Sequence, residues 1–422
     1  MFGLLSKFQE RIKNKVRKRW RWLFHATDFY SLMFPCFIFS RMLGIFPYKF
    51  NGSSFETSKS RYILSSVVIG VFGIFLFIMF YNMDISGDIQ LDGVPDALQG
   101  NCYYTLGGFI TIVTYILCGS RMRVLQSVME VSLTLPPKSY RELSKIIHAK
   151  DIVGFVFLFG QIANCRAITI IHAMSKLLGL YVTLLVFQMD MLYMNCVCVL
   201  KACFQAINDN LTTLRELVIN DEPRLLMRIY DERNSVLLMK LKTLQKWHLK
   251  ISDTVQMLNV IFSLQLLATV VMTFVEITFS LYFYIVRLVE KVSVINLDKQ
   301  IWYSYIATSV TYYFIKLALI VWSCETSKNQ ALRIGTSVHD VLQNTKDKQI
   351  KHELESFSLQ ILHRDNTFSA KGFTVDAKLL TSIVGSICTY LLILIQFMNA
   401  KHFCDDPSSS NVTQIFQVEN NN

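Results

Sequence analysis

Charged residues are scarce in this sequence. Lys, Arg, Asp and Glu make up 17% of the 422 residues, whereas soluble proteins carry about 25%, and hydrophobic residues reach 52%. A chain of this length could form two or three soluble domains. Long apolar runs recur along all of it, however, so the composition excludes that arrangement. It predicts an all-α, polytopic membrane protein.

Three other absences exclude further classes. The basic start of the chain precedes an apolar run without a small-residue cleavage site, so we expect no cleavable signal peptide. The ten cysteines show no zinc-ligand spacing. Cys196, Cys198 and Cys203 lie in an apolar run, where small buried side chains are the simpler interpretation. No His, Cys or carboxylate cluster is spaced for catalysis. We therefore expect no enzymatic activity, metal or cofactor.

Seven segments are apolar and long enough to cross a bilayer, which takes about 20 residues. They are residues 62–83, 102–120, 152–172, 178–204, 254–286, 301–323 and 378–398. An eighth apolar stretch, about 29–48, contains Pro35, Arg41 and many aromatic residues. We expect this stretch to lie in the membrane interface rather than to cross.

The distribution of positive charge predicts the orientation, because cytoplasmic loops carry an excess of Lys and Arg. With seven spans and a cytoplasmic N-terminus, 34 of the 42 Lys and Arg residues lie inside, five lie outside and three lie within spans. If residues 29–48 also crossed, the basic loops would lie outside. We therefore expect an extracellular C-terminus. The net charge of +11 then belongs to the cytoplasmic face and requires no nucleic acid.

This orientation divides the chain into five regions. They are a cytoplasmic basic N-terminus (1–61) that includes the interfacial stretch, six spans with cytoplasmic extensions (62–323), a cytoplasmic anchor segment (324–377), a seventh span (378–398) and an extracellular tail (399–422). Leu and Met recur every three or four positions in 208–253, and 325–362 shows a similar pattern. We expect helices that continue into the cytosol, with a break at Pro223, and that form a packed helical layer.

The orientation also separates three glycosylation sequons. Asn411 would be extracellular and available for a glycan. Asn51 and Asn210 would be cytoplasmic and unmodified.

The seventh span carries a polar stripe on one helical face. Its positions, spaced alternately by four and three, are Ser382, Ser386, Thr389, Ile393 and Gln396. Polar groups that face lipid lack partners, so the stripe must face protein or water. One interpretation is packing against a neighbouring helix. The other is a pore wall in which Ile393 and Phe397 form apolar constrictions. Asp405 and Asp406 follow, either as a cation-attracting outer mouth or as a solvated tail.

The stretch TYLLILIQF, residues 389–397, resembles the seventh-helix signature of the insect gustatory receptor family, which is Thr-Tyr, five apolar residues and Gln-Phe. The likeness extends upstream to residue 356 and includes SLQILH and FSAKGF. It also touches DFYSLMFPCFIFSRMLGIFPY near the N-terminus and ACFQAINDNLTTL at 202–214. The resemblance implies a homotetramer whose seventh helices surround a central pore and whose cytoplasmic helices join the subunits. It places Gln396 and Phe397 at the pore constriction, with Thr389 lower on the same helix.

The resemblance implies a gustatory receptor of the plasma membrane, acting as a ligand-gated non-selective cation channel that a small tastant opens. Leu391 follows the Thr-Tyr pair, where the main sugar clade typically has Glu. The segment SFSLQILH is more similar to branches with fructose-type and broadly tuned or bitter-type receptors. The expected tastant is therefore a sugar such as fructose or a bitter compound. A hetero-oligomer with related receptors is also open.

Charged and aromatic residues in the outer half of the bundle, together with Asp190 at mid-depth, are the candidate ligand pocket, since the family's pocket lies in the outer half. They are Arg166, Asp190, Glu276, Trp302, Tyr303 and Tyr305. Charges inside a membrane are rare and tend to be paired or functional. Arg166 with Glu276 or Asp190 therefore forms either a structural ion pair or part of a polar ligand site. Lys201 and Lys316 lie toward the cytoplasmic side, and we interpret them as snorkelling side chains.

Two other classes of membrane protein are alternatives to a ligand-gated channel. A seven-helix receptor that signals through a G protein has its N-terminus outside, opposite to the charge distribution here, and the sequence has no Asp-Arg-Tyr or Asn-Pro-x-x-Tyr run. A membrane transporter would be indicated by a repeat between the two halves or by paired Gly/Pro-broken helices, and neither stands out.

Overall fold

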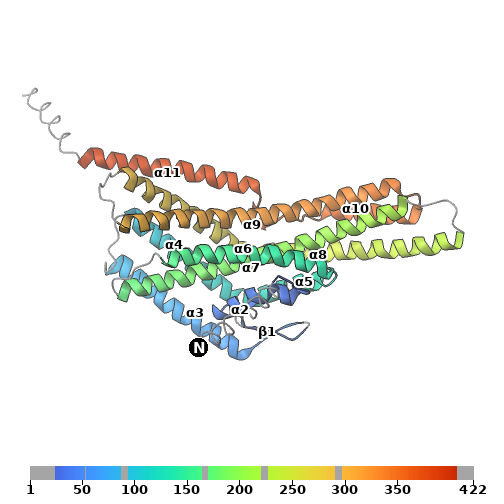
Figure 1. Cartoon of the computed structure of the whole chain (residues 1–422), viewed down its shortest axis with the longest axis horizontal. Helices are drawn as coiled ribbons and strands as arrows, with labels where there is room; N and C mark the ends of the chain where they lie inside the picture. The colour runs from blue at the N-terminus through green and yellow to red at the C-terminus, as the bar shows by residue number, and fades with distance from the viewer. Residues whose placement is uncertain are drawn as a thin grey trace, which may run out of the picture.

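The computed structural model describes residues 24–52, 54–86, 94–163, 170–219, 227–289 and 297–405, which are almost entirely helical (Figure 1). The helices are α2 (Phe29–Met42), α3 (Lys59–Phe80) with a π-helical turn η1 (Tyr81–Ile85), α4 (Val94–Ile116), α5 (Cys118–Ser132), α6 (Pro137–Ala163), α7 (Ile170–Ile219), α8 (Met227–Val289), α9 (Leu297–Asn344), α10 (Lys348–His363) and α11 (Ala377–Asp405). Two short antiparallel hairpins pair β1 (Tyr48–Phe50) with β2 (Phe55–Thr57) and β3 (Ser369–Ala370) with β4 (Phe373–Thr374).

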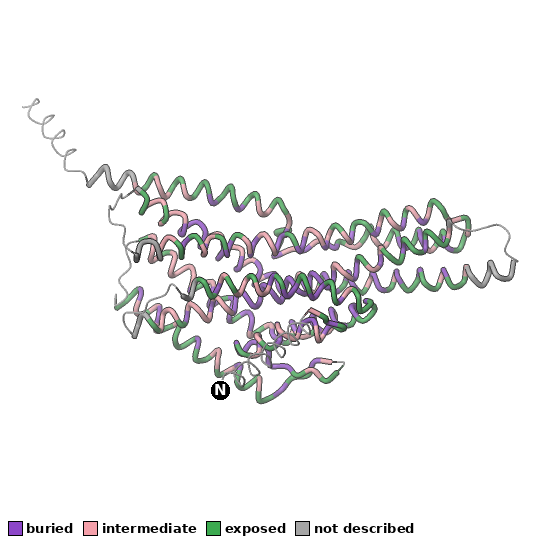
Figure 2. The backbone as a smooth tube through the Cα atoms, in the orientation of Figure 1, coloured by how far each residue is buried: buried purple, intermediate pink, exposed green. Residues whose placement is uncertain are grey.

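The long helices lie side by side, and α7 forms the centre of the bundle. In the most apolar 18-residue segment of α7, 89% of the residues are buried. The corresponding share is 17% for α3 with its π-helical turn and 11% for α11. Helix α7 packs most extensively on α9 and also contacts α8, α4 and α6. Helix α11 contacts only α8 and α9 among the element pairs with substantial packing, and Figure 2 shows it largely exposed at the edge.

The seven predicted spans fall mainly on α3, α4, α6, α7, α8, α9 and α11. The second span also reaches the start of α5, and the third reaches the start of α7. Within the described residues, α3, α7, α8, α9 and α11 are long and apolar enough to cross a membrane, and α4 with α5 makes a sixth candidate, bent by 67°. Helix α6 ends at Ala163, before the end of the predicted third span, and residues 164–169 lie outside the described part. The number seven therefore stays a prediction.

Helix α2 corresponds to the predicted interfacial stretch. Asp28 caps its start, because the Asp28 carboxylate accepts a hydrogen bond from the Ser31 N–H at 2.7 Å and the Ser31 hydroxyl accepts one from the Asp28 N–H at 3.2 Å. On α7, the Gln188 amide donates to the Ser40 hydroxyl at 2.8 Å and so ties α2 to the bundle. The 14 residues of α2 span about 21 Å, which is shorter than a bilayer core of about 30 Å.

Helices α7, α8 and α9 continue well past the predicted spans, as the periodicity of 208–253 and 325–362 indicated. Pro223, the predicted break, lies outside the described residues. Polar contacts join these extensions. They are Asn208 to the Gln330 carbonyl (2.9 Å), Asn234 to Asp347 (2.8 Å), Gln360 to His248 (3.0 Å) and Arg364 to Asp253 (2.8 Å). The extensions and α10 therefore form the predicted packed helical layer.

The β3–β4 hairpin fixes the start of α11. Its turn is Lys371-Gly372, and both residues have positive φ (48° and 93°), a conformation that glycine adopts without steric cost. On α8, Asn259 donates to the Thr367 carbonyl at 2.7 Å and accepts from the Ser369 N–H at 3.2 Å. Helix α11 therefore leaves the helical layer from a position that α8 determines.

Candidate functional site

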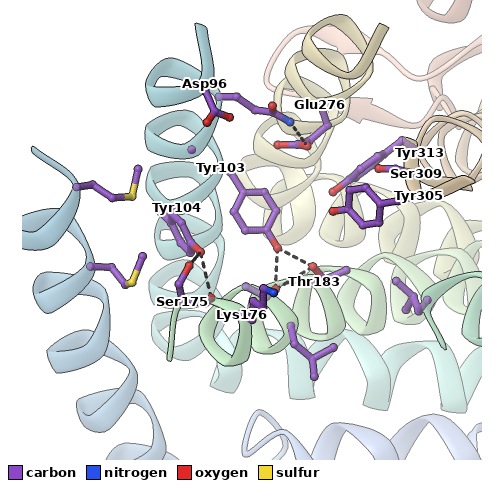
Figure 3. A pocket seen from close by; sticks show the side chains of 17 residues that line it. Asp96, Tyr103, Tyr104, Ser175, Lys176, Thr183, Glu276, Tyr305, Ser309 and Tyr313 are labelled. Carbon is purple, nitrogen blue, oxygen red and sulfur yellow. Dashed lines mark hydrogen bonds between the residues drawn. The ribbon is translucent and has the colours of Figure 1, made fainter. Parts of the chain in front are cut away.

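A cavity of about 330 Å³ lies at one end of the bundle. The C-terminal ends of α3 and α8 and the N-terminal parts of α4, α7 and α9 meet there (Figure 3). The charge distribution predicts that this end faces the outside of the cell. A volume of this size is in the range of sites for small organic molecules.

Four tyrosines dominate the aromatic lining of the cavity: Tyr103 and Tyr104 from α4, and Tyr305 and Tyr313 from α9. Figure 3 shows Tyr103 in the middle, with Tyr104 on one side and the two α9 tyrosines on the other. The Tyr103 hydroxyl donates to the Gly179 carbonyl at 2.7 Å and lies 2.6 Å from the Thr183 hydroxyl.

The Tyr104 hydroxyl lies 3.1 Å from both the Ser175 carbonyl and the Ser175 hydroxyl. Since Ser175 and the residues that Tyr103 bonds all lie on α7, these hydrogen bonds fix both α4 rings against that helix.

Glu276 is the deepest charge of the lining. The residue is only 7% exposed, and its Oε2 accepts a hydrogen bond from the Gln99 amide at 2.9 Å. Its other oxygen, Oε1, is buried without a hydrogen-bond partner in the described part of the chain. A buried carboxylate oxygen without a donor is costly, so Glu276 presents an unfilled acceptor at the cavity.

The structure brings two of the predicted pocket residues together, because Glu276 and Tyr305 both line the cavity. Trp302 and Tyr303 are not part of the lining. The Trp302 ring lies 3.9 Å from the Arg287 guanidinium, and the Tyr303 ring packs on Tyr284. Arg166 lies outside the described residues, so its expected pairing stays a prediction.

Asp190 lies deeper in the bundle and is fully buried. Its partner is Lys316, whose ammonium lies 3.2 Å from Asp190 Oδ2, and the Thr269 hydroxyl donates to Oδ1 at 3.1 Å. The interpretation of Lys316 as a snorkelling side chain is wrong, because the residue is 2% exposed and paired. Lys316 also lies 5.2 Å from the ring of Tyr313, so this ion pair directly supports a wall of the cavity.

Several lining residues were missed at the sequence level. They are Asp96, Gln99, Tyr103, Tyr104, Ser175, Lys176, Thr183, Ser309 and Tyr313. A signal was present, since all of these polar and aromatic residues except Tyr313 fall near the ends of predicted spans that face outward in the predicted orientation. Tyr at a helix end is also typical of a membrane interface, so the signal does not by itself distinguish a pocket.

The polar stripe of α11 is turned away from the rest of its own chain. Ser382, Ser386, Thr389, Ile393 and Gln396 are all exposed, and Phe397 is 71% exposed. On the opposite face Ile383 and Ile387 are buried. The stripe therefore does not pack against the described part of its own subunit and is open to another chain, lipid or water.

The predicted tail residues lie at or beyond the end of the described chain. Asp405 is the last residue of α11, while Asp406 and Asn411 lie outside the described residues.

One contact connects the cavity to the stripe-bearing helix. The Phe274 ring on α8 packs edge-on against Tyr390 of α11, with ring centroids 5.7 Å apart. Glu276 lies two residues further along α8. A displacement of this part of α8 would therefore reach α11 through direct contact.

Comparisons with known proteins found both similar sequences and similar structures. The family model described as "7tm Chemosensory receptor" matches residues 33–399. The chain is 30% identical over 152 residues to a Drosophila melanogaster protein named "Putative gustatory receptor 28b", covering 36% of this chain and 32% of that protein. It is 25% identical over 158 residues to "Gustatory receptor for sugar taste 43a" of the same organism, covering 37% and 36%. The chain thus aligns with about a third of the length of these relatives.

The fold has a solved counterpart. The insect olfactory receptor OR5 from Machilis hrabei, in complex with eugenol, superposes with a TM-score of 0.66 at 12% identity, covering 86% of this chain and 97% of that one. A second structure of the same receptor gives a TM-score of 0.62 at 12% identity. At this identity the likeness concerns the fold alone.

Proposed function

Because the chain belongs to the 7tm chemosensory receptor family, a family of membrane receptors and not of enzymes, we propose that it is an insect gustatory receptor. In this proposal the protein acts in the plasma membrane as a ligand-gated, non-selective cation channel that opens on binding a small tastant. The observation that carries the proposal is the exposed polar stripe of α11, which needs a partner outside its own chain.

The proposed topology has seven spans, a cytoplasmic N-terminus and an extracellular C-terminus. It is supported by the concentration of Lys and Arg at one end of the bundle. The short length of α2 also supports it, because 14 residues do not cross a bilayer core of about 30 Å. In this topology the helical layer lies in the cytosol, and the 330 Å³ cavity lies in the outer half of the membrane.

The proposed assembly is a homotetramer in which four α11 helices turn their stripes to a common axis. Hydroxyl and amide groups would then face water, which removes the cost of exposing them to lipid. Gln396 and Phe397 would form the narrowest part, Ile393 an apolar ring, and Thr389, Ser386 and Ser382 the wall below. Asp405 and Asp406 would lie at the outer mouth.

The proposed gating uses the α8–α11 contact. A ligand in the cavity would contact Glu276, and the Phe274–Tyr390 pair would transmit a shift of α8 to the pore helix.

We assign the chain to the fructose-type or broadly tuned branches, a narrower statement that rests on Leu391 and the SFSLQILH segment.

The test is a recording from cells that express this chain alone. Single-channel currents evoked by an agonist are expected. Gln396→Ala and Phe397→Ala should change ion selectivity or resting leak while the amount of protein at the surface persists. Ile387→Ala, on the buried face of the same helix, is the matched control. Unchanged selectivity and leak in both Gln396→Ala and Phe397→Ala would refute the pore placement.

A further inference from the structure

Most polar groups of the cavity are already bonded to one another. The Tyr103 hydroxyl is held by Gly179 and Thr183, and the Tyr104 hydroxyl by Ser175. The Thr183 hydroxyl itself donates to the Gly179 carbonyl at 2.9 Å. A polyhydroxylated ligand would need several unpaired donors and acceptors, and these groups would have to break existing bonds to supply them.

Among the described lining residues, the buried polar atom without a hydrogen-bond partner is a carboxylate oxygen. Glu276 Oε1 has no donor, and Gln99 already holds Oε2. Asp96 lies three residues before Gln99, so it shares the same face of α4 and adds a second carboxylate to the lining. A buried carboxylate is stabilised chiefly by a cation.

Within the described part of the chain, no Lys or Arg side chain occupies this position. Lys316 is bound to Asp190 at 3.2 Å. Lys176 lies across the cavity from Glu276 in Figure 3, beside Thr183 on α7. The negative charge of Glu276 is thus left for a molecule that enters the cavity.

The tyrosines supply the second half of a cation site. Because the hydroxyls of Tyr103 and Tyr104 are bonded to α7, these residues contribute mainly their aromatic rings to the lining, and Tyr305 and Tyr313 line the same cavity from α9. Aromatic faces attract ammonium groups, and several rings around one carboxylate form a site that selects organic cations.

We propose that the cavity binds a small organic cation, a quaternary or protonated amine, whose charge lies against Glu276 and whose alkyl groups contact the four tyrosine rings. The inference rests on the proposed function in that it takes this cavity as the receptor's ligand site. Binding itself does not depend on whether the chain conducts ions.

The experiment measures binding to the full chain, purified in lipid nanodiscs. The probes are choline and its neutral carbon isostere, in which a tert-butyl group replaces the trimethylammonium group. The two have nearly the same shape, so they differ in charge alone. Choline should bind at least about tenfold more tightly than the neutral alcohol, as expected for a desolvated cation between aromatic rings.

Two variants test whether the carboxylate of Glu276 binds the positive charge of choline. Glu276→Gln keeps the size of the side chain and should weaken choline binding about tenfold or more, while binding of the neutral alcohol is unchanged. Glu130→Gln is the control, because Glu130 lies on α5 near Lys250 and outside the lining, and it should bind choline like the parent protein.

A second pair tests the rings without changing charge. Tyr103→Phe keeps the aromatic face and should retain choline binding, whereas Tyr103→Leu should weaken it about tenfold. If Glu276→Gln does not fold, the two Tyr103 variants and the comparison of the two probes on the parent protein still test the proposed cation site.

The inference is overturned if choline does not bind, if the neutral alcohol binds equally well, or if the folded Glu276→Gln protein binds choline as the parent does. Choline binding without currents would refute the channel and leave the cation site standing. Currents evoked by a neutral sugar without choline binding would do the opposite.

Discussion

At the scale of single residues, the buried pair of Asp190 and Lys316 is the most consequential charge interaction. Both side chains are at most 2% exposed, and they join α7 to α9 at the centre of the bundle. Two charges taken out of water are stabilised mainly by each other, so losing one partner strands the other. The pair therefore acts as a constraint on the register of these two helices.

We predict that Asp190→Asn or Lys316→Met alone lowers the stability of the protein by about 3–5 kcal/mol, because each leaves one uncompensated buried charge. The double variant should recover most of that loss. Thermal melting of the purified proteins measures both effects. A double variant as unstable as the sum of the single ones would show that the two charges do not stabilise each other.

His248 is a buried titratable residue of the helical layer. It is fully buried on α8, its Nδ1 lies 3.0 Å from the Gln360 amide, and its ring packs edge-on against Phe357. Burial, with a smaller effect of the Arg364 charge, lowers the pKa of His248 to about 4. Since an unfolded His has a pKa near 6.5, the folded layer binds fewer protons than the unfolded chain between these two values.

We predict that stability is lost as the pH falls from about 6.5 to about 4, by on the order of 3 kcal/mol, and that His248→Gln removes most of this dependence. Melting temperatures at neutral pH and at pH 5 in the same detergent measure it. His352→Gln, at an exposed position on α10, is the control and should leave the slope unchanged. An unaltered slope in His248→Gln would exclude this residue as the origin.

At the scale of elements, α11 combines two faces with different partners. Ile383 and Ile387 hold the helix against its own subunit, while the stripe that begins at Ser382 faces outward. Its start is fixed by the β3–β4 hairpin, which bonds Asn259 of α8. Among the described residues, the helix is thus anchored at its base and on one side, which is compatible with the proposed pore-lining role.

The accessibility of α11 to a water-soluble reagent should follow these faces. We predict that a cysteine at Ser386, Ile393 or Gln396 is modified by an impermeant cationic thiol reagent and that the modification blocks the current. A cysteine at Ile387 should not react. The native Cys388 is exposed on the same helix, so the background is Cys388→Ser. Equal modification at Ile387 and Ile393 would mean that the stripe is not the water-facing side.

The sequence predicts elements better than it predicts contacts between them. The stripe on α11 was recognisable because the helical period alone determines which residues share a face. The pairing of Asp190 with Lys316 was not, because the rotation and depth of α7 against α9 depend on packing that no local pattern encodes. Tyr103 and Tyr104 were missed for a related reason: a tyrosine at a helix end looks the same whether it faces lipid headgroups or a cavity.

At the scale of the whole molecule, the two ends of the chain decide the topology together. A cytoplasmic N-terminus and an extracellular C-terminus require an odd number of spans, and the seven helices that overlap the predicted spans meet that condition. If both ends lay on one side, one of these helices could not cross. The weakest candidate is then α6, which did not qualify as a span within the described residues.

We predict that the expressed protein carries a glycan at Asn411 and none at Asn51 or Asn210. Enzymatic deglycosylation should increase the gel mobility of the parent protein and of Asn210→Gln, but not of Asn411→Gln. Asn210 lies within α7, where its amide bonds the Ala206 carbonyl at 2.7 Å, so a missing glycan there is ambiguous alone. An N-terminal epitope tag resolves this, because the tag should be stained only after permeabilisation. Staining of intact cells would reverse the proposed orientation and move the stripe, the cavity and the helical layer to the opposite sides of the membrane.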